Sequence, residues 1–347
     1  MVTFGGDCHK KTHTVVAVDE NGRQLGERTV AATPSGHMEA LSWARQWSQR
    51  QWALENCRHL SRVLERNLLN AGEAVVQVSP KLMGGARRSG RELGKSDPID
   101  ALAVARAALR EPRLPVAQLE GKEREVKLLV DHREDLVGER TRIQNRLLWH
   151  LHEVEPGYQV VASGLLRAVV LAEVRTRLEN HSGVVAEIAL ELVDRLAELT
   201  RSIKRLQRRI EVLMHELAPS LLSLAGCAGL SAAKLVAETA DVSRFRSSAA
   251  FAMHNGTAPI PVWSGNHERH RLNRGGNRQL NVVLHRIAIT QMRVGGQASD
   301  YIARRLSMGN SKTEAIRALR RQISDEVYRR LRQDHSRRST ALMAVAA

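Results

Sequence analysis

The sequence predicts an α/β domain at the N-terminus, a long helical arm in the middle and a mostly α-helical C-terminal part. Three observations predict this organisation. Short apolar runs alternate with helical spacing up to about residue 112, an apolar heptad pattern fills the middle of the chain, and the last third is helical and basic. The chain has 347 residues, which is more than one domain usually contains. We expect boundaries that separate residues 1–115, 116–218 and 219–347.

The N-terminal part begins with three expected strands, at residues 2–6, 14–18 and 24–31. The last two are joined by Asn21-Gly22, a typical hairpin turn, so they are expected to be antiparallel. Helices and strands then alternate, with helices at 38–47 and 60–70, strands at 51–55 and 74–78, and a further helix from Asp97. This order fits a ribonuclease H-like layer, although periodicity alone does not select that fold.

The middle of the chain carries an apolar seam that predicts a coiled-coil arm. Its positions alternate in steps of four and three: Leu192, Leu196, Leu199, Ile203, Leu206, Ile210, Leu213 and Leu217. Upstream, Leu129, Leu136 and Ile143 repeat at intervals of seven, so 122–153 is the expected partner helix. The seam could join two helices of one chain or two chains of an oligomer, and both remain open.

The composition narrows the classes of partner and cell compartment. The formal net charge of +16 indicates a polyanionic partner, and the aromatic content of 3% makes base stacking a weak expectation. Cys8, Cys57 and Cys227 are odd in number and form no CxxC pair, which argues against a disulfide framework or a cysteine zinc site. No apolar stretch reaches the roughly 18 residues of a membrane span, and no signal peptide is evident. We expect a soluble, cytoplasmic protein without a membrane partner.

Four acidic residues are candidates for a divalent-metal site. Asp7 and Glu55 end apolar runs, and Asp97 and Asp100 lie at the start of an expected helix. Residues three apart share a helix face, and strand-end acids would meet that face where the first and fourth strands lie side by side. Carboxylate oxygens are hard ligands that suit Mg²⁺ or Mn²⁺.

Each acid also has a purely structural interpretation. Asp97 before Pro98 would be a good N-cap, and Asp100 would lie in the first turn, where the helix dipole favours negative charge. Asp7 could be a turn residue and Glu55 a surface charge. Histidines at 9, 13, 267 and 270 lack the additional ligands of a closed zinc site, and solvated basic loops are the expected setting for them.

The C-terminal part contains two features that suggest contact with nucleic acid. Gly226 and Gly229 lie in Leu-Ala-Gly-Cys-Ala-Gly-Leu-Ser at 224–231, where paired glycines between helices either present backbone amides to a phosphate or simply form a tight turn. Ser311 and Glu314 form a capping box before an amphipathic helix. The basic face of that helix is either solvated or turned to phosphate, and comprises Arg317, Arg320, Arg321, Arg329 and Arg330.

Two motifs, together with Asp7 and Glu55, resemble the insertion-sequence 110 family of DEDD transposases over nearly the whole chain. They are Lys-Ser-Asp-Pro-Ile-Asp-Ala at 95–101 and Gly-Thr-Ala-Pro at 256–259, which is followed by Ser264-Gly265. The chain departs from the family pattern at Gly5-Gly6, where a branched apolar residue is commoner, and at the apolar residues 261–263 before the serine.

The resemblance implies a RuvC-type N-terminal domain, a coiled-coil insertion and a C-terminal transposase domain. It implies that Asp7, Glu55, Asp97 and Asp100 bind Mg²⁺, or Mn²⁺, and that Ser264 is the nucleophile. It further implies a bacterial, nucleoid-associated DNA recombinase that is guided by a structured RNA. Because recombination joins several DNA ends, we expect a dimer or tetramer.

Chemistry is consistent with a nucleophilic serine in this setting. A hydroxyl near its free pKa is a poor nucleophile and needs a base, a metal or a cationic environment. Basic side chains that could hold the scissile phosphate follow Ser264, namely Arg269, Arg271, Arg274 and Arg278. The residues 275–277, Gly-Gly-Asn, are expected to open another helix. Two other functions remain open: a metal-dependent junction nuclease in which water attacks, and a nucleic-acid-binding protein without catalysis.

Overall fold

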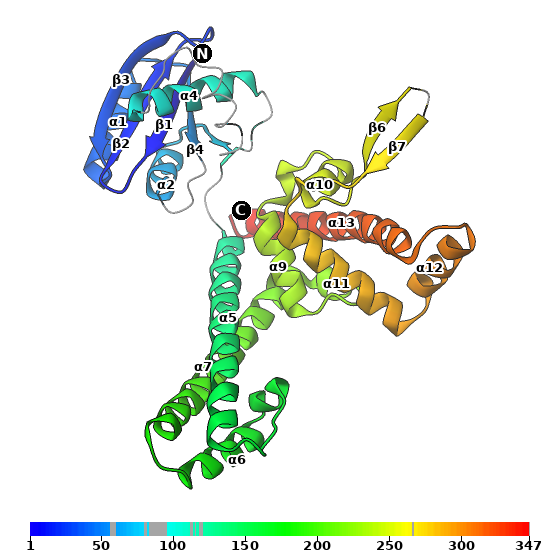
Figure 1. Cartoon of the computed structure of the whole chain (residues 1–347). Coiled ribbons are helices and arrows are strands. Elements are labelled where there is room, and N and C mark those ends of the chain that lie inside the picture. Colours follow the sequence, from blue (N-terminus) through cyan, green and yellow to red (C-terminus); the bar gives the residue numbers. More distant parts are fainter. Residues whose placement is uncertain are drawn as a thin grey trace. The chain divides into compact units, whose positions relative to one another are not determined.

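The chain divides into two compact units, Met1–Gly121 and Lys122–Ala347 (Figure 1). The computed structural model describes residues 1–55, 60–79, 82, 96–111, 114, 116–117, 121–265 and 267–346; the side chains of 264, 267–269 and 341–346 are outside this description. The second unit contains both the expected arm and the expected C-terminal part, so their separation near residue 218 stays a prediction.

The first unit is built on a five-stranded sheet in the order β3-β2-β1-β4-β5. Its strands are β1 (Val2–Cys8), β2 (Thr12–Val18), β3 (Gln24–Ala31), β4 (Arg50–Glu55) and β5 (Val75–Val78). Strand β2 pairs antiparallel with both β1 and β3, whereas β4 pairs in parallel with both β1 and β5. This arrangement confirms the ribonuclease H-like sheet predicted from the order of strand and helix patterns.

Helices cover both faces of this sheet (Figure 1). Helices α1 (Pro34–Ala44) and α2 (Arg62–Asn70) share an apolar core with alternate strand residues such as Phe4, which stacks on Trp52 with ring centroids 4.8 Å apart. Helix α4 (Asp97–Arg110) packs on the other face, against Val16 and Val18. Side chains alternate between the faces of a strand, so each strand contributes to both layers.

Helix α4 lies directly on the backbone of β1 because residue 5 is glycine. A Cβ atom on Gly5 would lie 2.1 Å from the carbonyl oxygen of Ala101 and 2.5 Å from the amide nitrogen of Ala105. Farther along α4, Arg106 Nε donates a hydrogen bond of 3.0 Å to the carbonyl of Gly22 in the β2–β3 turn. The departure from the family pattern at this position therefore allows the helix to approach the strand.

Two histidines pack inside the first unit. His13 in β2 is 2% exposed and its ring stacks on that of His37 at a centroid distance of 5.1 Å. Asn67 Nδ2 lies 2.8 Å from His37 Nδ1, and the buried Nδ1 of His13 has no hydrogen-bond partner among the described residues. The expectation of a solvated loop at residue 13 is therefore wrong, because the strand turns this side chain inward.

The second unit begins with two long helices that pack along one another, α5 (Lys122–Val154) and α7 (Val184–Leu217) (Figure 1). A 3₁₀ turn (Ala162–Leu166) and α6 (Ala168–Glu179) close one end of the pair. Most of the predicted seam is buried, but Leu206 and Leu213 are only partly buried. The seam therefore joins helices within one chain, and a regular coiled coil and an oligomeric contact stay predictions.

The remaining helices form a second core in which Phe251, Leu284 and Val327 are buried. They are α8 (Pro219–Leu222), α9 (Gly229–Thr239), α10 (Ser248–Asn255), α11 (Arg278–Val294), α12 (Gln297–Ser307) and α13 (Lys312–Ala346), with a 3₁₀ turn (Val242–Arg244). A hairpin of β6 (Ile260–Ser264) and β7 (His267–Arg271) follows α10. The predicted capping box is confirmed, since Ser311 N donates to Glu314 Oε2 at 2.8 Å.

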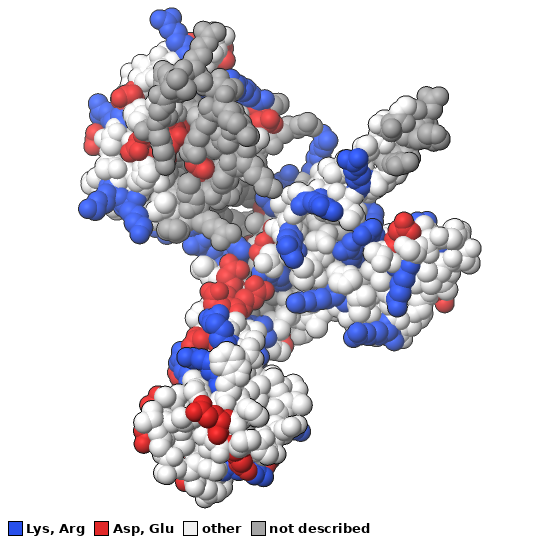
Figure 2. Space-filling view, viewed as in Figure 1, with Lys and Arg blue, Asp and Glu red and all other residues white. Residues whose placement is uncertain are grey.

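The predicted arginine face of α13 is partly wrong. Arg320 Nη1 donates to Asn281 Oδ1 at 2.9 Å, and Arg330 binds Ser220 and Ser223, so these two side chains join helices together. They turn inward because α13 packs against α8, α10, α11 and α12. In Figure 2, Lys and Arg side chains are nevertheless spread over the visible face of the C-terminal helices. None of the described helices is both long enough and apolar enough to cross a membrane.

We expect Gly5→Ala to destabilise the first unit by about 1–3 kcal/mol, because the methyl group meets backbone atoms that cannot rotate away. Urea denaturation followed by tryptophan fluorescence measures the change. Gly138→Ala on α5 is the matched control. Its Cβ would lie 3.6 Å from the nearest atom, Arg142 Nη1, and alanine favours a helix. Equal stability of the two variants would contradict the close approach of α4.

We also expect the first unit to lose stability as the pH falls from 6.5 to 4. Burial lowers the pKa of His13 from 6.5 to about 4, so the unfolded chain takes up a proton before the folded one. The contribution of neutral His13 to the free energy of unfolding is complete above pH 6.5 and is lost on acidification. The loss is on the order of 2–3 kcal/mol. Denaturation midpoints against pH should vary less for His13→Phe than for wild type, whereas the exposed-site variant His152→Gln should follow wild type.

Candidate active site

The end of β1 and the start of α4 bring three potential ligands together. Atoms of Asp7, His9 and Asp97 all lie within 4.8 Å of one another. The Nε2 atom of His9 is 3.1 Å from Asp7 Oδ2 and 3.3 Å from Asp97 Oδ1. Residues that are 90 positions apart in the sequence therefore meet at one corner of the first unit. We call this group of Asp7, His9 and Asp97 the acidic corner.

Capping does not explain Asp97. The N-cap of α4 is Ser96, whose backbone is extended, and Asp97 is the first helical residue, with Pro98 after it. The carboxylate of Asp97 is half exposed and lies next to His9. The structural interpretation of Asp97 as an N-cap is therefore wrong by one residue, and its side chain is available to the acidic cluster.

Asp100 and Glu55 approach the same corner from different elements. Asp100 lies one turn into α4 and is 6% exposed. Glu55 ends β4, and the parallel register pairs Gly6 with Leu54, so the next positions along the two strands are Asp7 and Glu55. Both have polar contacts of their own, and neither belongs to the compact group around His9. Their role as metal ligands stays a prediction.

The electrostatics of Asp7 favour a nearby cation. Burial raises the pKa of Asp7 above its usual value, and the carboxylates of Asp100 and Asp97 act in the same direction, whereas contact with His9 opposes them. Carboxylate oxygens drawn together in a partly buried site repel one another unless a positive charge lies between them. The oxygen-rich donor set fits Mg²⁺ or Mn²⁺ better than a soft metal ion.

His9 was not identified as a site residue from the sequence. It follows Asp7 by two positions, and residues two apart on an extended chain point to the same side. The two-residue spacing is the only feature of the sequence that could have identified His9. The expected strand ended at Gly6, so the spacing was not applied as far as residue 9. The structure extends β1 to Cys8, which directs His9 toward the acids.

Ser264 ends β6 in the second unit, where it pairs with His267 of β7. Its side chain and that of Arg269 lie outside the described residues. Asn277 caps α11 by accepting a hydrogen bond from Leu280 N, which confirms the helix predicted after the glycine pair. The predicted phosphate ligands Arg271, Arg274 and Arg278 are exposed.

Amide side chains hold the base of this hairpin. Asn255 Nδ2 donates to Ser324 Oγ at 2.8 Å in a buried position, and Asn281 Nδ2 donates to the carbonyl of Asn255 at 3.0 Å. Beyond β7, Asn273 Nδ2 donates to the carbonyl of Met253 at 2.8 Å. Both ends of the segment that carries Ser264 are therefore anchored to the helical core.

We expect Mg²⁺ or Mn²⁺ to raise the denaturation midpoint of the first unit. At a free concentration 100 times its dissociation constant, the ion would add about 2.7 kcal/mol to the free energy of unfolding. Asp7→Asn should abolish this gain, because it removes the negative charge of a buried carboxylate. Glu20→Gln, at an exposed position of the β2–β3 turn, should retain the gain. A shift of equal size in both variants would show that the ion does not bind at this corner.

Known proteins resemble this chain along most of its length. The IS116 insertion-element protein of Streptomyces clavuligerus, a 44.8 kDa protein, is 26% identical over 95% of this chain and 94% of its own. The 42 kDa IS900 insertion-element protein of Mycobacterium paratuberculosis is 23% identical over 100% of this chain and 99% of its own. Among solved structures, Thermus thermophilus RuvC bound to a Holliday junction is 17% identical, with a TM-score of 0.27, over 34% of this chain and 99% of that one.

Two family models match separate parts of the sequence. Residues 4–156 match the DEDD transposase model of the IS110 type, and residues 218–303 match the transposase model of the IS116/IS110/IS902 family. The first match contains the acidic corner, and the second contains the hairpin with Ser264. Together the two matches cover more than half of the sequence, and the chain belongs to the IS110/IS116 family of insertion-sequence DNA transposases.

Proposed function

We propose that this transposase cuts and rejoins DNA through a metal-assisted serine nucleophile. Asp7, Glu55, Asp97 and Asp100 would hold the metal ion, and Ser264 would attack the DNA phosphate. The observation that carries the proposal is the convergence of Asp7 and Asp97 from different elements, with buried Asp100 one turn away. Burial and the neighbouring carboxylates raise the pKa of Asp7, so a cation bound beside it would stabilise its ionised form.

Each part of the proposed site has a chemical task. A bound Mg²⁺ would supply Lewis acidity and orient the phosphate. Ser264 Oγ would bond to phosphorus and release its hydroxyl proton to water. The bond between phosphorus and a deoxyribose oxygen breaks at the same time, and that oxygen takes up a proton from water. The exposed Arg271 and Arg274 would offset charge that develops on the phosphate oxygens. The phosphoserine bond keeps the energy of the broken DNA bond, so rejoining needs no nucleotide cofactor.

The proposal includes a structured guide RNA and an assembly of two or four chains. The guide RNA comes from the resemblance to the family, and the net charge of +16 supports a large nucleic-acid surface. Strand exchange joins several DNA ends, which favours more than one copy of the chain at the junction. The half-exposed carboxylate of Asp97 leaves the acidic corner accessible to a substrate.

A metal-dependent nuclease is the second candidate. It is favoured by the convergence of potential ligands at the acidic corner, where a bound hard metal ion would activate a water molecule as the nucleophile. In that case Ser264 binds phosphate and no covalent adduct forms. A third possibility, a binding protein without catalysis, predicts that chelator leaves DNA binding unchanged and that no strand is ever cut.

A denaturing gel separates these functions. Labelled element-junction DNA, cognate RNA and Mg²⁺ are incubated with wild type, Ser264→Ala or Asp97→Ala. We expect a covalent protein–DNA band in wild type only, with cleavage by Asp97→Ala reduced about 100-fold or more. Ser48→Ala and Glu20→Gln, at exposed positions of the first unit, are the matched controls and should behave as wild type.

Two outcomes would contradict the serine mechanism. Cleavage by Ser264→Ala at the wild-type rate would assign the attack to water and favour the nuclease. Absence of cleavage by wild type in every combination of DNA, RNA and metal would favour the binding protein.

A further inference from the structure

A groove of about 840 Å³ lies in the second unit between the 222–228 turn, the start of α9 and one face of α11. Helix α11 contributes His285, Arg286, Thr290 and Arg293 to its wall, and α9 contributes Ser231. None of the described residues that line it is acidic, and none is aromatic apart from the histidine ring. The groove thus offers hydrogen-bond donors and positive charge without a platform for base stacking.

Two arginines give the groove its charge. Arg286 and Arg293 are exposed, and their guanidinium groups make no hydrogen bond or ion pair with the described residues. They are seven residues apart on α11, which places them on one face about 10 Å apart along the axis. Phosphates on one DNA strand rise by about 3.4 Å per nucleotide, so the two guanidinium groups match phosphates a few nucleotides apart.

The start of α9 adds backbone donors to the same wall. Its N-cap is Ala228, which has no side-chain acceptor, and no acidic residue lies in its first turn. The first amides of a helix have no partner within the helix and carry partial positive charge. Glu211 of α7 lies next to Gly229 but does not line the groove.

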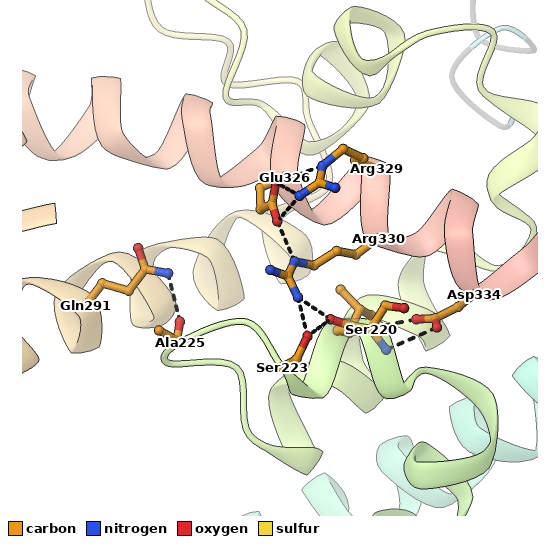
Figure 3. A network of polar contacts seen from close by, with 9 residues as sticks. Ser220, Ser223, Ala225, Gln291, Glu326, Arg329, Arg330 and Asp334 are labelled. Atoms are coloured by element: carbon orange, nitrogen blue, oxygen red, sulfur yellow. Dashed lines mark hydrogen bonds and ion pairs between the residues drawn. The ribbon is translucent and has the colours of Figure 1, made fainter. Parts of the chain in front are cut away.

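The turn is held in place before any ligand arrives. Gly226 has a φ of +78°, and a Cβ there would lie 3.1 Å from the carbonyl of Ile287, so the turn rests on α11. Figure 3 shows the contacts that brace it from two sides. Gln291 Nε2 donates to the carbonyl of Ala225 at 2.8 Å, and Arg330 donates to Ser223.

The same network ties the preceding helix α8 to α13. Asp334 is 1% exposed and accepts hydrogen bonds from Ser220 N at 3.1 Å and Leu221 N at 3.4 Å, while Arg330 donates to the carbonyl of Ser220 (Figure 3). Because these contacts use buried or half-buried groups, they hold α8, which leads into the turn, against α13. A preformed site loses little conformational entropy when it binds.

We propose that this groove binds the sugar–phosphate backbone of duplex DNA and holds the substrate independently of the metal site. Arginine side chains and helix N-terminal amides are donors suited to phosphate oxygens, and they carry no base-specific information. The proposal deepens the proposed function, on which it rests, by adding a holding surface in the second unit. It also gives a role to Gly226 and Gly229: the first forms the turn, and the second begins the helix whose amides face the phosphate.

Binding of a fluorescent DNA duplex at several salt concentrations tests the groove. We expect Arg286→Gln with Arg293→Gln to weaken binding by about tenfold or more and to lower the slope of log affinity against log salt by about 2. The control pair is Arg201→Gln with Arg208→Gln, two exposed arginines that are also seven residues apart on a helix, α7. It should have a smaller effect on both quantities.

Ser231→Asp provides a test that does not depend on arginine. An acid in the first turn of α9 stabilises the helix and places a negative charge in the groove. We therefore expect unchanged or higher thermal stability together with weaker DNA binding. Glu20→Gln, at an exposed position outside both sites, should bind duplex DNA as wild type does. Binding is measured with chelator present, so that no metal-dependent step contributes, which separates failure of the groove from failure of the catalytic proposal.

Three results would overturn the assignment. The first is duplex affinity that is the same in the groove pair and in wild type, and the second is an equal loss in the groove and control pairs. The third is that the groove pair binds a structured RNA more weakly but binds duplex DNA as wild type does, which would identify the groove as an RNA-binding site.

Discussion

Helix α4 approaches β1 as closely as two backbones allow, and the acidic corner depends on that contact. Because Gly5 has no side chain, the backbone of Ala101 rests on the strand. The first turn of the helix then comes within reach of the strand end, and Asp97 meets His9 and Asp7. A larger residue at position 5 would separate the two elements, and the carboxylates would face solvent singly.

This packing concentrates negative charge in a protein that is otherwise strongly basic. Burial and neighbouring carboxylates disfavour the ionised form of Asp7, and His9 compensates only in part. A folded protein tolerates such a cluster when a cation, a substrate or both complete it. A divalent ion, as proposed, would stabilise the ionised carboxylates of this corner, which links the local fold to the proposed chemistry.

Positive charge is divided between two tasks in the second unit. Arg320 and Arg330 bridge helices, whereas Arg286 and Arg293 face an open groove without partners among the described residues. The sequence pattern placed Arg320 and Arg330 on an outward face, because a helical period locates a side chain around its own axis only. Packing of α13 against several helices turned these positions into contacts.

The sequence by itself determined the alternation of strands and helices, the apolar seam, the caps at Ser311 and Asn277, and the candidate acids, because each depends on neighbours within a few residues. It predicted that four acids meet, but it did not determine which of them form the closest group. Only the tertiary structure brought Asp97 to Asp7, added His9, moved the cap of α4 to Ser96 and formed the groove on α11. These features depend on contacts between distant segments, and a close approach such as that at Gly5 leaves no periodic signal along the chain.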